Sequence, residues 1–365
     1  MASRKLARRV SRIGVIAASA GVIAGLASFA LRGFLLWHMI LMLYTGFIMF
    51  PHYVAIAYIS SSASKKGVLL TNAMAIASTP LVILPIIARV YWPRLASALV
   101  LVAAIAGIAA SLGSAVERRG SLRLSLILAG IAYAGLALST AYWWASGFRA
   151  SLVDYALSVA LAYTATLIYA VTSHSLPSTF ADRPSPPVSL VAALGSVLAG
   201  LCVLEGNDPW IAGDIWLASA LLYIYGARLH RVGRYFRVAR EKSRGSEKAY
   251  RGLWYYLVGH VFVLLVVLLA SVVLAWASRE LVIPRARASL ILLHLLGLGF
   301  AWMHVAIHAP MMLPVILGVR HAMRYNAWPY ILVLGATLLW PVSGVASLVL
   351  AAAGFAAMLL VFFKV

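Results

Sequence analysis

The chain has 365 residues, of which 64% are hydrophobic and 11% charged, and its mean hydropathy is +0.96. A composition this apolar excludes an ordinary soluble domain and a disordered chain, and it indicates a protein embedded in a lipid bilayer. The single cysteine, Cys202, excludes an intramolecular disulfide and a cysteine-ligated cluster.

Apolar stretches of about 18 residues or more recur along the whole chain, each long enough to cross a hydrocarbon core about 30 Å thick. We therefore expect an all-α, polytopic bundle of about twelve transmembrane helices that forms one integral membrane domain over residues 1–365. In chain order, the expected spans are 13–31, 34–60, 68–90, 95–116, 124–145, 152–173, 188–205, 211–228, 253–277, 288–317, 328–343 and 345–363. The last two could instead be one long helix broken at Pro341 and Gly344.

The net charge of +21 supports a definite topology. Most of the 30 Lys and Arg residues fall on one side of the expected helices, and such residues concentrate on the cytoplasmic side of membranes. We expect a multi-pass protein of the cell membrane with both termini in the cytoplasm and a basic cytoplasmic loop at about 229–252. Anionic lipid headgroups explain the charge of this loop, and no nucleic-acid partner is expected because no folded nucleic-acid module is present.

Two expected spans carry histidines at the same spacing. His38 and His52 lie in 34–60, and His294 and His308 lie in 288–317, each pair 14 positions apart. On an α-helix, 14 residues rise about 21 Å and return the second ring to within roughly 40° of the first. Because the two helices run in the same direction, the spacing predicts two stacked sites. The outer site is formed by His38 with His294, and the inner site by His52 with His308.

Paired imidazoles from different helices are the axial ligands of b-type haem. Two haems about 20 Å apart along the membrane normal could pass electrons across the bilayer, so we expect one or two b-type haems at these pairs. The alternative is that a membrane histidine hydrogen-bonds a neighbouring helix without any cofactor.

Other histidines are candidate metal ligands. His304 and His308 form an i, i+4 pair that can chelate one metal, and His52 or His260 could complete a copper site in place of the inner haem. His174, at the inner end of its span, is a further candidate. The simpler alternative for His304 is an interhelical hydrogen bond. No catalytic residue is assigned.

Several short segments together resemble one known family. Trp37, His38, Gly46 and Phe47 resemble a pattern of the form Trp-His-x-His-Glu, an apolar run and Gly-Phe. The segment 168–180, IYAVTSHSLPSTF, resembles a mid-chain glycine-rich turn with a proline and Phe-Thr. The later matching positions are Leu253, Trp254, His260, His294 and Gly299.

These segments resemble the NnrS family, membrane proteins with twelve predicted helices that carry haem and copper and are linked to nitric oxide stress. Ile40 and Leu41 replace the second His and the Glu of the first motif, and the family's later Thr-Arg and Gly-His elements are absent. A weaker likeness is to haem-copper oxidase helices, because His294 is followed by Leu313 and Pro314.

The leading hypothesis is thus a membrane haem protein, a possible oxidoreductase or electron-transfer subunit, that acts in the nitric oxide response or in transmembrane electron transfer. One rival is a transporter or channel with a histidine-lined path. Another is a membrane anchor subunit that binds a redox partner subunit of a respiratory complex.

Overall fold

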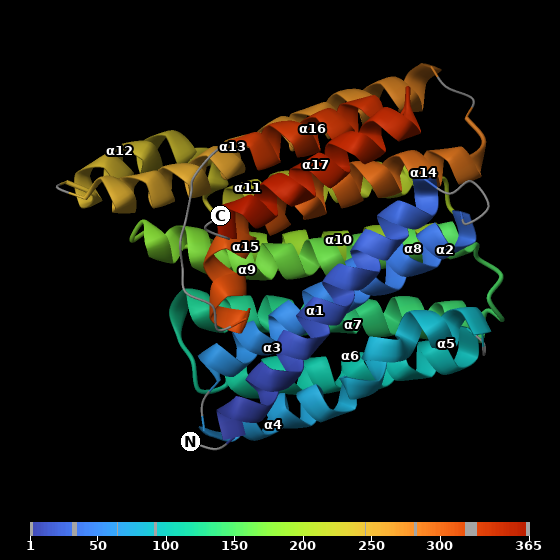
Figure 1. Cartoon of the computed structure of the whole chain (residues 1–365), viewed down its shortest axis with the longest axis horizontal. Coiled ribbons are helices and arrows are strands. Elements are labelled where there is room, and N and C mark those ends of the chain that lie inside the picture. The colour runs from blue at the N-terminus through green and yellow to red at the C-terminus, as the bar shows by residue number, and fades with distance from the viewer. Residues whose placement is uncertain are drawn as a thin grey trace.

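The computed structural model describes residues 3–30, 35–63, 65–90, 93–244, 246–280, 283–317 and 327–362, and every regular element among them is a helix (Figure 1). The first elements are α1 (Ser3–Ala30), α2 (Leu35–Leu41), η2 (Met42–Met49), α3 (Phe50–Ser62), α4 (Lys65–Ala77), η3 (Thr79–Ile83), α5 (Leu84–Val90), α6 (Pro93–Ala115), α7 (Gly120–Ala145), α8 (Leu152–Val159), η4 (Ala160–Ala165) and α9 (Thr166–Thr179). The remaining elements are α10 (Pro186–Leu204), α11 (Pro209–Gly226), η5 (Leu229–Arg231), α12 (Val232–Lys242), α13 (Glu247–Glu280), α14 (Arg285–His294), η6 (Leu295–Ala301), α15 (Trp302–Leu317), α16 (Trp328–Leu339) and α17 (Gly344–Phe362).

The all-α class is confirmed for the described residues, and their apolar helices support a membrane protein. Within the described ranges, nine helical stretches are long and apolar enough to cross a membrane. The number is ten if α11 and the bent segment that follows it, η5 with α12, form one span. The helices α16 and α17 are apolar but shorter in their described parts, and they pack against each other as two separate helices. The count of twelve spans and the side on which each terminus lies stay predictions.

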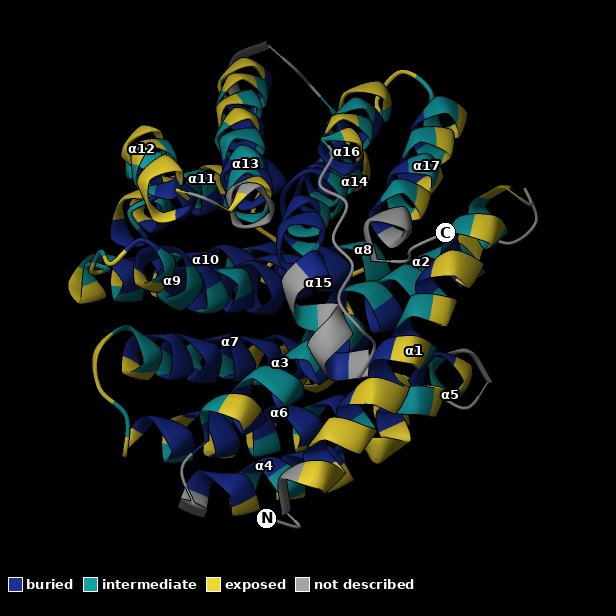
Figure 2. Ribbon diagram, turned by 60° about the vertical axis from the view of Figure 1, so that its left-hand side comes forward, coloured by how far each residue is buried: buried dark blue, intermediate teal, exposed yellow. Residues whose placement is uncertain are grey.

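Burial grades from the centre of the bundle to its rim. In the most apolar 18 residues of the span 152–179, 89% of the residues are buried. In the corresponding stretch of α1 the share is 28% (Figure 2). Exposed Ile, Leu and Val side chains cover the outward faces of the peripheral helices, and a continuous apolar surface of this kind is typical of lipid contact.

Proline marks several helix starts. Pro93, Pro186 and Pro209 are the first residues of α6, α10 and α11, where the missing N–H of proline costs no hydrogen bond. At α11 the side chain of Asp208 also accepts a hydrogen bond from the N–H of Trp210 at 2.9 Å. These local signals account for the close agreement between the predicted and observed starts of these spans.

Three spans contain a π-helical segment, and the apolar pattern of the sequence did not predict these segments. They are η2, η4 and η6, and each lies in the middle of its span. The hydroxyl of Thr164 in η4 donates a hydrogen bond to the carbonyl of Phe47 in η2 at 3.0 Å. Because each residue inserted into an α-helix turns the following part by about 100°, histidines on the two sides of such a segment lose the shared face expected from their spacing.

Two glycines bring α7 and α10 close to the central span. A Cβ atom on Gly135 would lie 2.5 Å from the carbonyl oxygen of Ala162, and one on Gly200 would lie 2.7 Å from that of Ser158. Small residues of this kind allow membrane helices to approach backbone to backbone.

Gly135→Ala is therefore expected to lower the free energy of unfolding by about 1–3 kcal/mol, because the added methyl group meets backbone that cannot move aside. Unfolding in a detergent titration measures the effect. The matched control is Gly233→Ala, because a Cβ atom at Gly233 has nothing within 4 Å. Equal stability of Gly135→Ala and the wild type would contradict the close packing.

The described residues of the basic segment 229–252, which was expected as a loop between spans, are largely helical. It forms η5, α12 and the start of α13, and α12 bends by 54° from α11. Figure 1 shows α12 and the beginning of α13 extending as a hairpin beyond the ends of the neighbouring helices. The carboxylate of Asp182 accepts hydrogen bonds from Tyr235 at 2.8 Å and from Arg231 at 3.1 Å, which attaches α12 to the bundle.

The Asp182 contact makes the docking of α12 dependent on pH. Burial acts to raise the pKa of Asp182, but hydrogen bonds from Arg183, Tyr235 and Arg231 and the charge of Arg231 outweigh it and hold the pKa below its usual value. A carboxyl with a lowered pKa stabilises the fold above its usual pKa, and this contribution is lost as the pH falls through the lowered value.

We expect the protection of the α12 amides against hydrogen exchange, measured relative to the intrinsic rate at each pH, to be unchanged from neutral pH to about pH 5 and to fall below about pH 4. Asp182→Asn should accelerate this exchange at neutral pH, by an amount equivalent to about 1 kcal/mol or less because the pair is partly exposed. Glu241→Gln, an exposed change on the same helix, serves as the control. Equal hydrogen exchange of the α12 amides in Asp182→Asn and Glu241→Gln would contradict the role of Asp182 in docking α12.

Candidate functional site

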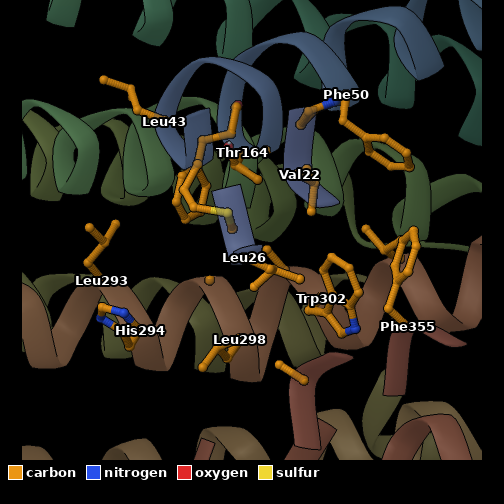
Figure 3. Close-up of a pocket in the computed structure, with 18 of the residues that line it drawn as sticks. Val22, Leu26, Leu43, Phe50, Thr164, Leu293, His294, Leu298, Trp302 and Phe355 are labelled. Carbon is orange, nitrogen blue, oxygen red and sulfur yellow. Dashed lines mark hydrogen bonds between the residues drawn. The ribbon is translucent and has the colours of Figure 1, made fainter. Parts of the chain in front are cut away.

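A cavity of about 840 Å³ lies among α1, the α2–α3 span, the α8–α9 span, the α14–α15 span and α17. Its lining is almost entirely apolar, yet it includes four of the nine histidines: His38, His294, His304 and His308. Figure 3 shows His294, Leu298 and Trp302 along one helix, across the cavity from Leu43 and Phe50.

His38 and His294 are held in the same way. The Nδ1 atom of His38 lies 2.8 Å from the carbonyl oxygen of Gly25, and that of His294 lies 2.8 Å from the carbonyl oxygen of Leu290. Because a carbonyl oxygen can only accept, each Nδ1 carries the proton and donates it, which leaves Nε2 of each neutral ring with a free lone pair.

Aromatic contacts fix both rings in the cavity wall. Trp340 stacks on His294 with ring centroids 4.0 Å apart and an interplanar angle of 19°, and Phe29 lies 5.1 Å from His38. Both imidazoles line the same cavity. A donated Nδ1–H and a fixed ring plane are the usual supporting features of metal-ligating histidines. His38 and His294, the predicted outer pair, thus line one cavity from different spans.

The structure does not bring His52 and His308 together. His52 is fully buried outside the cavity lining, with Nε2 at 2.5 Å from Oγ of Ser78 and Nδ1 at 3.0 Å from the hydroxyl of Tyr133. Both ring nitrogens therefore already have polar partners within the protein. His52 follows η2 and His38 precedes it, so the π-helical segment accounts for their different surroundings.

His308 instead belongs to a group of three histidines. His260 on α13 lies 6.0 Å from His308 and 6.4 Å from His304 between ring centroids, and His304 and His308 lie 6.3 Å apart. The structure thus joins the predicted i, i+4 pair to His260, and His52 lies elsewhere. Among the described residues, no three His, Cys, Asp or Glu side chains already meet the distances of a metal site.

His174 lies apart from this group. It is half-buried, its Nδ1 lies 3.0 Å from Oγ of Ser121, and its ring lies 6.4 Å from Tyr58. These contacts correspond to an interhelical hydrogen bond, the simpler alternative for a membrane histidine.

Some residues of the site were not predicted from the sequence. Tyr256 contacts both His260 and His308, and its position four residues before His260 could have placed it on the same helix face. The contact of Trp340 with His294 joins distant parts of the chain and leaves no local signal. The side chains of Leu313 and Pro314, which carry the likeness to haem-copper oxidases, lie outside the described part of the chain.

The fold and the site define a class: a multi-pass helical membrane protein with a histidine-lined apolar cavity. Comparison with protein-family models, curated proteins and solved structures finds no match to this chain. The resemblance to the NnrS family stays a prediction.

Proposed function

We propose that the protein is a membrane haem protein that holds one b-type haem in the apolar cavity between His38 and His294. The observation that carries this proposal is that two fixed imidazoles from different spans share one cavity, each with Nδ1–H donated to a carbonyl. Because Nδ1 donates in each ring, Nε2 of each neutral ring carries a lone pair that could bind a metal.

The residues present fit a haem group. A cavity of about 840 Å³ is within the range of roughly 300–1,000 Å³ that suits molecules of this size. Apolar and aromatic side chains, among them Phe47, Trp302 and Phe355, suit the faces of a porphyrin. Neutral histidines are the common axial ligands of b-type haem, and hydrogen bonds donated by their Nδ1–H groups tune the iron.

This arrangement favours electron transfer over ligand chemistry. A haem held by His38 and His294 would have both axial positions filled and would supply one-electron redox chemistry within the membrane. The carbonyls of Gly25 and Leu290 hold the two tautomers, and the apolar lining excludes water from the site. A role in the nitric oxide response requires one imidazole to leave. The apolar lining argues against an ion path through this cavity.

The test is an optical spectrum of the protein purified from a haem-replete host. A reduced-minus-oxidised spectrum typical of six-coordinate b-type haem is expected, with no shift when dilute nitric oxide is added to the reduced protein. A shift at stoichiometric nitric oxide would favour the nitric oxide alternative over electron transfer. Absence of haem would refute both.

A further inference from the structure

The cavity continues well beyond the pair of histidines proposed as haem ligands. Along α14 to α15 its lining runs from Leu290 to Met312, which is roughly 30 Å at the rise of a helix. His294 lies near one end of this run, and His308 lies about 20 Å further along the same span. A haem at His38 and His294 therefore leaves the part of the cavity around His308, here called the His308 end, for a second occupant.

Two nitrogens of cavity-lining side chains toward the His308 end have no hydrogen-bond partner among the described residues. They are Nε1 of Trp302 and Nε2 of His308, and both are buried. The hydroxyls of Thr164 and Ser347, which also line the cavity, already donate to backbone carbonyls. Buried polar atoms nearly always have a partner, and an indole N–H can only donate, so the ligand has to accept hydrogen bonds. We infer that the His308 end binds the head group of an isoprenoid quinone.

The cavity opens toward lipid. Ile16 and Ile23 of α1 belong to its lining, and each is also about half exposed on the outside of the bundle. Both lie inside the stretch of α1 that is long and apolar enough to cross a membrane. A ligand that enters beside these side chains comes from the bilayer and has to be soluble in it. The isoprenoid tail of a quinone meets this requirement, and the tail can extend past α1 into the lipid.

The lining selects a neutral head group. Among its described residues there is no Asp, Glu, Lys or Arg. The phosphate of a phospholipid or the carboxylate of a fatty acid would be buried here without an opposite charge, which is strongly unfavourable. A quinone is neutral, and its two carbonyl oxygens accept hydrogen bonds from groups such as the indole N–H of Trp302. An apolar wall with a few polar groups is typical of sites for small molecules.

The shape of the wall and the proposed haem favour a quinone over other neutral lipids. The rings of Trp302 and Phe355 lie 5.4 Å apart at 43°, and Figure 3 shows both on the cavity wall, where they offer contact to a flat ring. The choice of a redox-active lipid rests on the proposed function, because a haem within the membrane exchanges electrons and a quinone carries them in lipid.

The experiment measures binding of radiolabelled decylubiquinone to the tagged, purified protein in detergent by a scintillation proximity assay. Saturable binding of one quinone per chain is expected. Trp302→Phe and His308→Leu each remove one hydrogen bond and keep the apolar volume, so each should weaken binding about threefold, and the double variant about tenfold. Unlabelled decylbenzene, which has the same tail and no carbonyl, should compete at least about tenfold more weakly than unlabelled decylubiquinone.

The matched controls are Trp276→Phe, at an exposed tryptophan, and His174→Leu, at a half-buried histidine; both residues lie outside the cavity lining, and neither change should alter binding. Circular dichroism and gel filtration establish that each variant is folded, and the competition by decylbenzene keeps the test decisive if a variant is not. His294→Ala removes a proposed haem ligand and leaves Trp302 and His308 in place, so it should still bind the quinone. Failure of the haem site and failure of the quinone site are thereby distinguished.

Three outcomes would overturn the proposal. They are absence of saturable binding to the wild type, equal competition by decylbenzene and decylubiquinone, and unchanged binding in the folded double variant of Trp302 and His308.

Discussion

The variant His294→Ala is expected to be purified without haem. His294 supplies one of the two ligands in the proposed site, and Trp340 stacks on its ring with centroids 4.0 Å apart. Loss of His294 leaves His38 as the one remaining ligand of the proposed pair, so the haem is held more weakly. We expect at least about a tenfold fall in the ratio of haem to protein, measured by absorbance after purification.

The control for this variant is His174→Ala, which removes a half-buried membrane histidine outside the cavity lining and should keep full haem content. Imidazole added to the growth medium should restore part of the haem to His294→Gly, because the truncated side chain leaves space for it. Full haem in His294→Ala, with an unchanged spectrum, would remove His294 from the site.

The variant His52→Ala is expected to keep haem but to lose stability. Its removal opens a cavity in the fully buried interior and deprives the hydroxyl of Tyr133 of the imidazole 3.0 Å away. The two effects together should lower the free energy of unfolding by about 2–4 kcal/mol. A detergent unfolding titration measures this loss, and the haem-to-protein ratio of the same sample should equal that of the wild type.

Ser78→Ala is the matched control for His52→Ala. It removes the other hydrogen-bond partner of His52, at 2.5 Å from Nε2, but leaves the imidazole in place. We expect a smaller loss of stability, about 1 kcal/mol, and unchanged haem. A parallel loss of haem in His52→Ala and His294→Ala would instead support the inner pair that the spacing of histidines predicted.

The membrane spans and the outer histidine pair could be predicted from the sequence for different reasons. Long apolar stretches between polar turns indicate spans directly, and proline at the starts of α6, α10 and α11 defines their boundaries. His38 and His294 both precede the π-helical segments of their spans. Their position in the cavity lining therefore does not depend on the 14-residue spacing from which the pair was predicted.

The surroundings of His52 and His308 could not be predicted from the sequence, because they depend on contacts between distant segments. The hydrogen bond that joins η2 to η4 connects Phe47 and Thr164, which are 117 residues apart. This bond is made by η2, whose π-helical geometry turns His52 away from the helix face that carries His38. The i, i+4 spacing of His304 and His308 can be read from the sequence. That His260, and not His52, is their neighbour depends on how α13 packs against α15.

The ratio of haem to protein in the purified wild-type chain tests the central claim most directly. The proposed site predicts one b-type haem per chain, because it places a single haem between His38 and His294, which line the same cavity from different spans. A ratio near zero after expression in a haem-replete host would contradict the claim, and a ratio near two would contradict the single site.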